Sequence, residues 1–293
     1  RNFLLDPLPM PLPIIDINRL VAIGAIRVDS PTDLSNPNTP RLKVFNGSQF
    51  VDFRLNDPAT VALLNPSNTT VILSHGWRSN SDDWPLITAQ RIWTRLGAGA
   101  VNIVAWDWWA QAAVTISNPL PSSDIACQQG ELLGKALLQS SLTTSFGGHV
   151  HFIGHSMGTI VNATASDYVH GAFPRASMNP ASHWQSTQTK PHITLLDEAG
   201  IAPKRGVNVT SASSVMWYFA KVGFKTMASV QISGRWNSPI PRQYLWIDNY
   251  ISEVGRPRAE AVNVVLTKFS TIPVIAHGYA YRWYSDTIPP TDP

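Results

Sequence analysis

The sequence contains a single cysteine, Cys127, among its 293 residues. One thiol cannot close a disulfide within the chain, and it cannot supply a metal site built from several cysteines. Charged residues are also scarce, at 14%, and the 22 lysines and arginines are scattered and leave a formal net charge of only +3. The lack of a basic run argues against nucleic-acid binding. The stability of the fold must therefore come from packing of its apolar residues.

Long apolar runs are missing as well. The apolar stretches are interrupted and strand-length, well short of the roughly 20 residues that a transmembrane helix needs. We expect no transmembrane segment. The chain starts at Arg1 with neither a methionine nor a charged and then apolar leader, and we expect a secreted or periplasmic protein whose signal peptide has been removed.

The remaining pattern predicts one α/β domain spanning residues 1–293. Residues 1–40 hold seven prolines, which disfavour regular helix and predict an extended N-terminal arm. Beyond the arm, strand-like and helix-like segments alternate, which is typical of a mostly parallel sheet flanked by helices. The predicted strands are 51–55, 70–73, 101–106, 149–153, 193–196, 244–247 and 262–266, and the predicted helices are 84–96, 124–142 and 159–165.

The most informative motif is GHSMG, from Gly154 to Gly158. A predicted strand precedes it and a predicted helix follows it, which is the context of the nucleophile elbow of α/β-hydrolases. The turn is so tight that side chains at the two glycine positions would collide with neighbouring backbone. We therefore expect Ser156 to be a catalytic nucleophile.

A serine nucleophile needs a neutral imidazole to remove its proton and a carboxylate to orient that imidazole. In the α/β-hydrolase fold the acid follows the serine and the histidine comes last. Two aspartates after Ser156, Asp197 and Asp248, directly follow apolar strand-like runs. His277 alone lies after either of them and is therefore the predicted base. The residues by themselves leave the choice of acid open.

The oxyanion of a tetrahedral intermediate needs hydrogen-bond donors. We expect the backbone N–H groups of Met157, which follows the nucleophile, and of Trp77, in the loop after the strand at 70–73. His149 and His151 lie two residues apart on one strand, but no third ligand has suitable spacing for zinc. We expect neither a metal nor another cofactor.

Several segments resemble the neutral lipase family typified by vertebrate pancreatic lipase, in order over residues 51–288. ILSHGW at 72–77 resembles the oxyanion loop of that family, NIVAWDW at 102–108 its next strand, HFIGHSMG at 151–158 its elbow, and ITLLDEA at 193–199 its acid motif. His277, followed by YRWYSDTI at 281–288, resembles its histidine segment. The resemblance implies an α/β-hydrolase fold, lipase activity, and Asp197 rather than Asp248 as the acid.

The chain also departs from that family. Glu198 replaces the usual proline, the family disulfides are absent, and the acidic cluster that holds calcium is missing after Asp197. Only 16 residues follow His277, so the C-terminal β-sandwich of the family is missing as well. A minimal, single-domain relative fits these departures.

The substrate is predicted only by class. Trp108, Trp109 and Trp217 are candidate substrate-binding residues because large apolar surfaces suit an acyl chain or an aromatic ester. Residues 200–242, and 213–234 in particular, are a candidate cap or lid over the site. The expected partner is a lipid or another ester, with contact at a lipid interface. The alternatives are an esterase for short-chain or polymeric esters and a non-catalytic lipid-binding relative.

Overall fold

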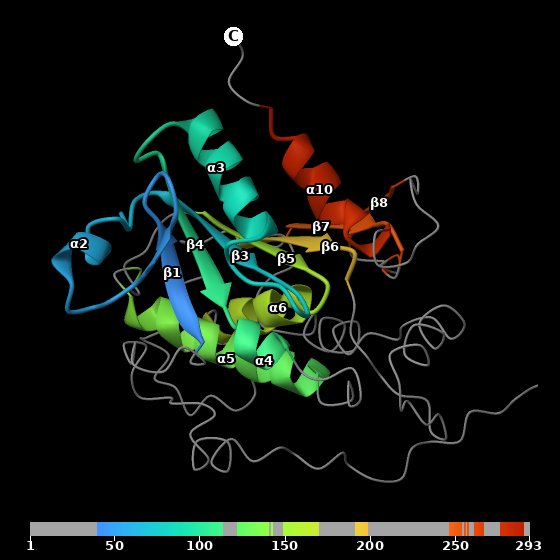
Figure 1. Ribbon diagram of the computed structural model, residues 1–293, viewed down its shortest axis with the longest axis horizontal. Helices are drawn as coiled ribbons and strands as arrows, with labels where there is room; N and C mark the ends of the chain where they lie inside the picture. The colour runs from blue at the N-terminus through green and yellow to red at the C-terminus, as the bar shows by residue number, and fades with distance from the viewer. Residues whose placement is uncertain are drawn as a thin grey trace, which may run out of the picture.

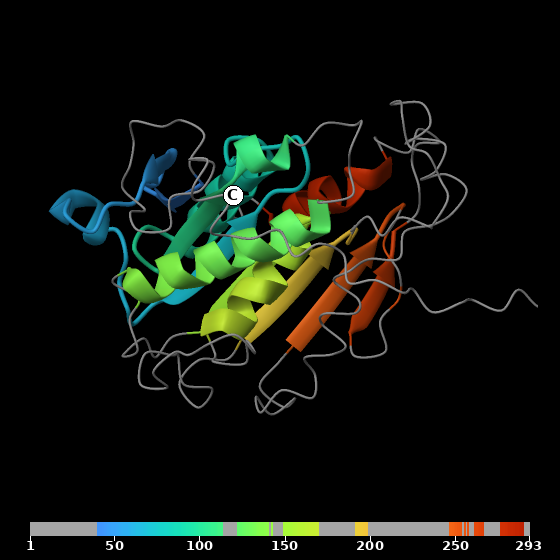
Figure 2. The ribbon, with the colours of Figure 1, turned by 90° about the horizontal axis from the view of Figure 1, so that it is seen from below.

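The computed structural model describes residues 40–113, 122–140, 142, 149–169, 191–198, 246–253, 255, 257, 261–266 and 276–289. Almost all of the predicted arm at 1–40, the whole predicted cap at 200–242 and Trp217 lie outside the described residues. The described part is built around one sheet, with helices packed on both of its faces (Figures 1 and 2).

The sheet contains eight strands within the described residues, in the order β2-β1-β4-β3-β5-β6-β7-β8. The strands are β1 (Arg41–Phe45), β2 (Phe50–Asp52), β3 (Thr69–Ser74), β4 (Val101–Asp107), β5 (Val150–His155), β6 (Pro191–Leu196), β7 (Trp246–Ile251) and β8 (Val262–Val265). Strand β1 runs antiparallel to β2 and β4, and all other neighbouring pairs are parallel. The predicted mostly parallel sheet is confirmed.

The register brings the ends of three central strands to one edge. Ser74 at the end of β3 pairs with Gly154 of β5, and His155 at the end of β5 pairs with Leu196 at the end of β6. Because parallel strands end at the same edge of a sheet, the loops that follow them lie side by side. The segments that carry Trp77, Ser156 and Asp197 therefore start from neighbouring strand ends.

Helices cover both faces of the sheet, as the two views show. One face carries α4 (Trp109–Ala112), α5 (Ser122–Gln139) and α6 (Gly158–Val169), and the other carries α3 (Trp84–Leu96) and α10 (Tyr279–Asp286). A further short helix, α2 (Pro58–Val61), lies between β2 and β3. Since β-strand side chains alternate between faces, neighbours such as Phe152 and Ile153 belong to the two different apolar clusters that these helices cover.

The structure differs from the predicted elements in several places. The strand expected at 51–55 is Phe50–Asp52, and β1 before it was not predicted. The strand expected at 244–247 runs from Trp246 to Ile251, because Asp248 pairs with neighbours on the sheet and does not end the strand. Helix α10 was also not predicted. In contrast, the helix at 84–96 has the predicted bounds, and the strands near 70, 101, 149, 193 and 262 are confirmed to within two residues.

Candidate active site

Ser156 lies in a sharp turn between β5 and α6, with a positive φ of 54°. L-residues rarely adopt this conformation, and when they do the surrounding packing must hold them there. A Cβ at Gly154 would lie 2.5 Å from the carbonyl oxygen of Gly158, and a Cβ at Gly158 would lie 2.0 Å from that of Ser74. Both glycines are therefore required by close backbone contact. The predicted elbow geometry is present.

Asp197 and His277 lie together at the same edge of the sheet. The Nδ1 atom of His277 is 2.6 Å from Oδ2 of Asp197. Asp197 is fully buried, whereas the side chain of His277 is 24% exposed. Since a carboxylate only accepts hydrogen bonds, Nδ1 of His277 carries the hydrogen and donates it. Nε2 lies on the far side of the ring from this hydrogen bond.

The second oxygen of Asp197 is held by the backbone. Its Oδ1 accepts hydrogen bonds from the N–H groups of Ser252, Glu253 and Gly255 at 2.8 to 2.9 Å. Burial alone would raise the pKa of Asp197, but the hydrogen bond and charge of His277, together with the N–H groups of Glu253 and Gly255, outweigh it and hold this pKa well below its ordinary value. Asp197 therefore stays ionised and fixed in orientation.

His155, the residue before the serine, connects the elbow to His277. The two imidazole rings lie 4.5 Å apart, and Nε2 of His155 donates to the carbonyl oxygen of His277 at 3.1 Å. Burial, followed by the nearby charge of His277, lowers the pKa of His155 to about 3. Our sequence reasoning missed this residue, although its place inside GHSMG was a signal. His155 thus ties His277 to the residue that directly precedes Ser156.

The two expected oxyanion donors lie on loops that touch each other. Met157 is buried directly after Ser156, and Trp77 is half-buried after Gly76. A Cβ built on Gly76 would lie 2.7 Å from the Cβ of Ser156, so the 74–77 loop packs against the serine itself. The loop that carries Trp77 and the elbow that carries Met157 are therefore in direct contact.

Asp248 occupies a different place. It lies inside β7, where its carboxylate accepts from Thr194 at 2.9 Å and contacts Nε2 of His192. The structure pairs His277 with Asp197, in agreement with the choice that the family resemblance implied. The alternative, Asp248, was considered because it directly follows a strand-like run, but the strand continues past it to Ile251.

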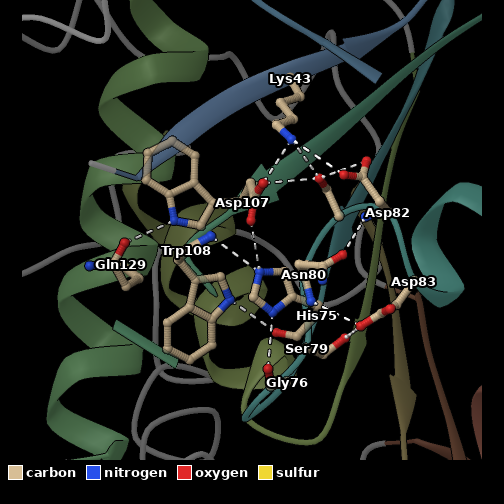
Figure 3. Close-up of polar contacts among 12 residues, drawn as sticks. Lys43, His75, Gly76, Ser79, Asn80, Asp82, Asp83, Asp107, Trp108 and Gln129 are labelled. Carbon is tan, nitrogen blue, oxygen red and sulfur yellow. Dashed lines mark hydrogen bonds and ion pairs between the residues drawn. The ribbon is translucent and has the colours of Figure 1, made fainter. Parts of the chain in front are cut away.

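The three candidate substrate-binding tryptophans differ in their exposure and surroundings. Trp108 is only 1% exposed; its backbone N–H donates to Nε2 of His75, and its indole N–H donates to the His75 carbonyl oxygen (Figure 3). The polar groups of Trp108 are therefore directed at the 74–77 loop, and its role in substrate binding stays a prediction. Trp109 is 46% exposed and remains available for a ligand. Trp217 lies outside the described residues.

Among the described residues, no group of three or more His, Cys, Asp and Glu side chains could hold a metal ion. No helix in the same part of the chain is long and apolar enough to cross a membrane.

The chain is similar at low identity to solved structures that include two esterases. A thermostable carboxylesterase from a metagenomic library is 12% identical, with a TM-score of 0.38 over 77% of this chain and 81% of that one. A hyperthermophilic esterase from Pyrobaculum calidifontis is 14% identical, with a TM-score of 0.37 over 77% and 75%. Such remote likenesses carry no information on substrate. No curated protein sequence matches the chain significantly.

The chain also matches a family model at the level of its sequence. Residues 71–270, which include the 74–77 loop, the elbow and Asp197, match the Alpha/beta hydrolase family. This match covers well over half of the chain, and the α/β-hydrolase fold predicted from the sequence agrees with it. The protein is therefore a member of the alpha/beta hydrolase family.

Proposed function

We propose that this hydrolase cleaves carboxylic esters, with Ser156 as nucleophile, His277 as general base and Asp197 as the acid that orients the base. The observation that carries the proposal is the 2.6 Å hydrogen bond between His277 and the buried Asp197, at the sheet edge where Ser156 is held at positive φ. Nucleophile, base and orienting carboxylate then act as one unit.

In the acylation step, Oγ of Ser156 attacks the ester carbonyl carbon while Nε2 of His277 takes the hydroxyl proton. Asp197 stabilises the resulting imidazolium through Nδ1 and does not itself become protonated. The backbone N–H groups of Trp77 and Met157 donate to the oxyanion of the tetrahedral intermediate. His277 then returns the proton to the leaving alcohol, and an acyl-enzyme remains.

Deacylation repeats the same chemistry with water. Nε2 of His277 takes a proton from a water molecule as that water attacks the acyl carbon, and the collapse of the second intermediate returns the proton to Ser156. Every group in this cycle belongs to the chain, so we expect full activity after dialysis against EDTA and in the presence of a thiol reductant.

Within the esters, we propose a lipase of the pancreatic-type neutral family, in a minimal single-domain form. The support for this is the serial resemblance across 51–288, together with the exposed apolar side chain of Trp109 at the start of α4. A lipase of this kind meets its substrate at a lipid interface, and secretion or export to the periplasm suits that role.

A fluorophosphonate probe tests the nucleophile directly, because it forms a covalent bond only with an activated serine. We expect peptide mass spectrometry to find the label on Ser156 of the wild type, and no label in Ser156→Ala or His277→Ala. Ser48→Ala, an exposed serine on the β1–β2 loop, is the matched control and should label fully. A folded wild type that does not label would favour the non-catalytic lipid binder.

An acyl-length series separates the substrate classes. We expect p-nitrophenyl esters of long acids and emulsified triglycerides to be hydrolysed, with a rate increase above the solubility limit of the substrate. A maximum at butyrate without that increase would indicate a short-chain esterase, and release of hydroxy acids from a polyester film would indicate a polyester hydrolase.

A further inference from the structure

A buried polar network lies beneath the 74–77 loop, and the proposed mechanism uses none of its side chains. His75 is fully buried, Trp108 is 1% exposed and Asp107 is 8% exposed. The close-up shows the imidazole of His75 between the loop and the end of β4, with Lys43 approaching from β1 (Figure 3). Buried polar groups are costly unless they are hydrogen-bonded, so this arrangement calls for a role.

The hydrogen bonds determine where the ring of His75 carries its hydrogen. Nδ1 lies 2.9 Å from the carbonyl oxygen of Gly76, and a carbonyl oxygen only accepts, so Nδ1 is the donor. On the other side, the backbone N–H of Trp108 donates to Nε2 at 3.1 Å. The ring is therefore clamped from both sides, with its N–H directed at Gly76.

This contact fixes the direction of the next N–H group in the chain. The carbonyl of Gly76 and the N–H of Trp77 belong to one planar, trans peptide, in which the two groups point in opposite directions. Once His75 holds the carbonyl on its own side, the Trp77 N–H must point to the other side. Gly76 itself lies directly against Ser156, since a Cβ on it would come within 3.3 Å of the serine Oγ.

Two further hydrogen bonds fix the flanking peptides of the same loop. The indole N–H of Trp108 donates to the carbonyl oxygen of His75 at 3.0 Å. The N–H of Arg78, which has a positive φ of 54°, donates to the carbonyl oxygen of Ala112 in α4 at 3.1 Å. The loop is thus anchored at three successive points.

An ion pair fixes the strand end from which Trp108 follows. Nζ of Lys43 lies 2.8 Å from Oδ2 of Asp107, and Ser81 donates to the same oxygen at 3.0 Å. Because β1 and β4 are neighbours in the sheet, this pair ties the two strands together directly before Trp108. Trp108, which holds the loop, is therefore itself fixed to the sheet.

We propose that His75 and Trp108 are positioning residues for the oxyanion hole, which orient the Gly76–Trp77 peptide so that its N–H points to the oxygen of the tetrahedral intermediate. The inference rests on the proposed ester hydrolysis and deepens it, since it identifies the side chains that pre-organise one of the two donors. Catalysis of this kind depends on donors that need no reorganisation during the reaction.

Trp108→Phe tests the indole contact, and the chain offers a matched control. Trp106 is also buried on β4 and donates its indole N–H to Gln129 at 3.0 Å, but it does not contact the 74–77 loop through that bond. We expect Trp106→Phe and Trp108→Phe to lower the melting temperature by similar amounts. Only Trp108→Phe should lower kcat, by about 10-fold or more, since the loss of a whole oxyanion donor costs about 10²- to 10³-fold.

A pair of amide substitutions tests His75 itself. The Asn amide lies near the position of Nδ1, so its NH₂ group can still donate to the Gly76 carbonyl oxygen. The Gln amide reaches the position of Nε2 instead, so it keeps only an acceptor for the backbone N–H of Trp108. We expect His75→Asn to retain kcat within about 5-fold of wild type and His75→Gln to lose about 10- to 100-fold, with KM little changed in both, because a donor made effective in the transition state acts on kcat.

Affinity for a trifluoromethyl ketone, whose adduct with Ser156 carries an oxyanion, separates positioning from general destabilisation. The inhibition constant should rise in parallel with the loss of kcat in Trp108→Phe and His75→Gln, and not in Trp106→Phe. Equal kcat in the His75→Asn and His75→Gln variants overturns the inference, and so does an unchanged inhibition constant in Trp108→Phe and His75→Gln. The proposed function still stands in either case if the wild type hydrolyses esters. A wild type without esterase activity overturns both.

Discussion

At the scale of single residues, Asp197 is the most constrained group of the proposed site. Three backbone N–H groups hold one of its oxygens and His277 holds the other. Its own backbone has a positive φ of 45°, directly after the last residue of β6. Both oxygens are thus assigned to fixed partners, and the carboxylate can present only one of them to the imidazole.

Asp197→Asn should lower kcat by about 10³-fold or more, as expected when an imidazole is held in the wrong tautomer. The three N–H groups will keep the amide oxygen on their side, so the amide NH₂ faces His277 and forces the ring to accept at Nδ1 and to carry its hydrogen on Nε2. A base protonated at Nε2 cannot take the proton of Ser156. Steady-state kinetics on p-nitrophenyl butyrate measures the loss.

The control for this prediction is Asp248→Asn, which removes a buried carboxylate with hydrogen bonds to Thr194 and His192. It should cost about 1–3 kcal/mol of stability, as for other buried hydrogen-bonded groups, and leave kcat within a few-fold of wild type. If Asp248→Asn loses activity while Asp197→Asn keeps it, the roles of the two aspartates are reversed.

At the scale of elements, two helix pairs hold the site in place. Helix α10 begins two residues after His277 and is joined to α3 by a 2.6 Å hydrogen bond between Ser285 and Thr88. On the other face, α6 starts at the elbow and packs closely against α5. A Cβ at Gly130 of α5 would lie 2.4 Å from the Cβ of Thr164 and 2.5 Å from the carbonyl oxygen of Val161, both on α6. The serine and the histidine are thus supported from opposite faces.

Gly130→Ala should destabilise the protein by about 1–3 kcal/mol, the usual cost of overpacking. Alanine favours a helix by up to about 1 kcal/mol over glycine, but this gain is smaller than the cost of moving the backbone of α6 away from α5. Thermal or urea denaturation measures the change, with Gln139→Ala, at an exposed position of the same helix, as control. Increased stability in Gly130→Ala would show that the two helices separate without strain.

At the scale of the whole molecule, several buried ionisable groups make the stability depend on pH in the same direction. Burial lowers the pKa of His155 to about 3 and that of His151 well below its ordinary value. Both histidines are neutral in the folded protein and become protonated when the chain unfolds in mild acid. The depressed pKa of Asp197 adds stability above about pH 4. That contribution to stability is lost only when the pH falls further.

We therefore expect stability to fall as pH decreases from about 6.5 towards 3, because the unfolded chain then binds more protons than the folded one. His155 alone should account for a loss of about 2 kcal/mol between pH 7.5 and pH 5, from its ordinary pKa of 6.5 and its folded value of about 3. Urea denaturation at the two pH values measures the loss.

His155→Gln should remove that share of the pH dependence while keeping a donor for the carbonyl oxygen of His277. His149→Gln, which removes an exposed imidazole, is the control and should behave like the wild type. An equal fall in stability for His155→Gln and wild type would mean that His155 is not held neutral in the folded protein.

The sequence alone determined those features that depend on residues close together in the chain. The elbow could be predicted because Gly154, Ser156 and Gly158 lie in one turn, where backbone sterics act over a few bonds. The central strands could be predicted because a strand buried on both faces reads as a continuous apolar run. For the same reason the end of β7 was misplaced, since Asp248 interrupts such a run although its partners on β6 keep it inside the strand.

The tertiary structure alone decided how distant residues were paired. Whether Asp197 or Asp248 meets His277 depends on strand register and on the backbone N–H groups of Ser252, Glu253 and Gly255. The supporting roles of His155 and Trp108 depend on contacts with segments 122 and 33 residues away. A hydrogen bond extends over about 3 Å and has a direction, so its partners are set by the packing of the sheet and helices, which no local pattern contains.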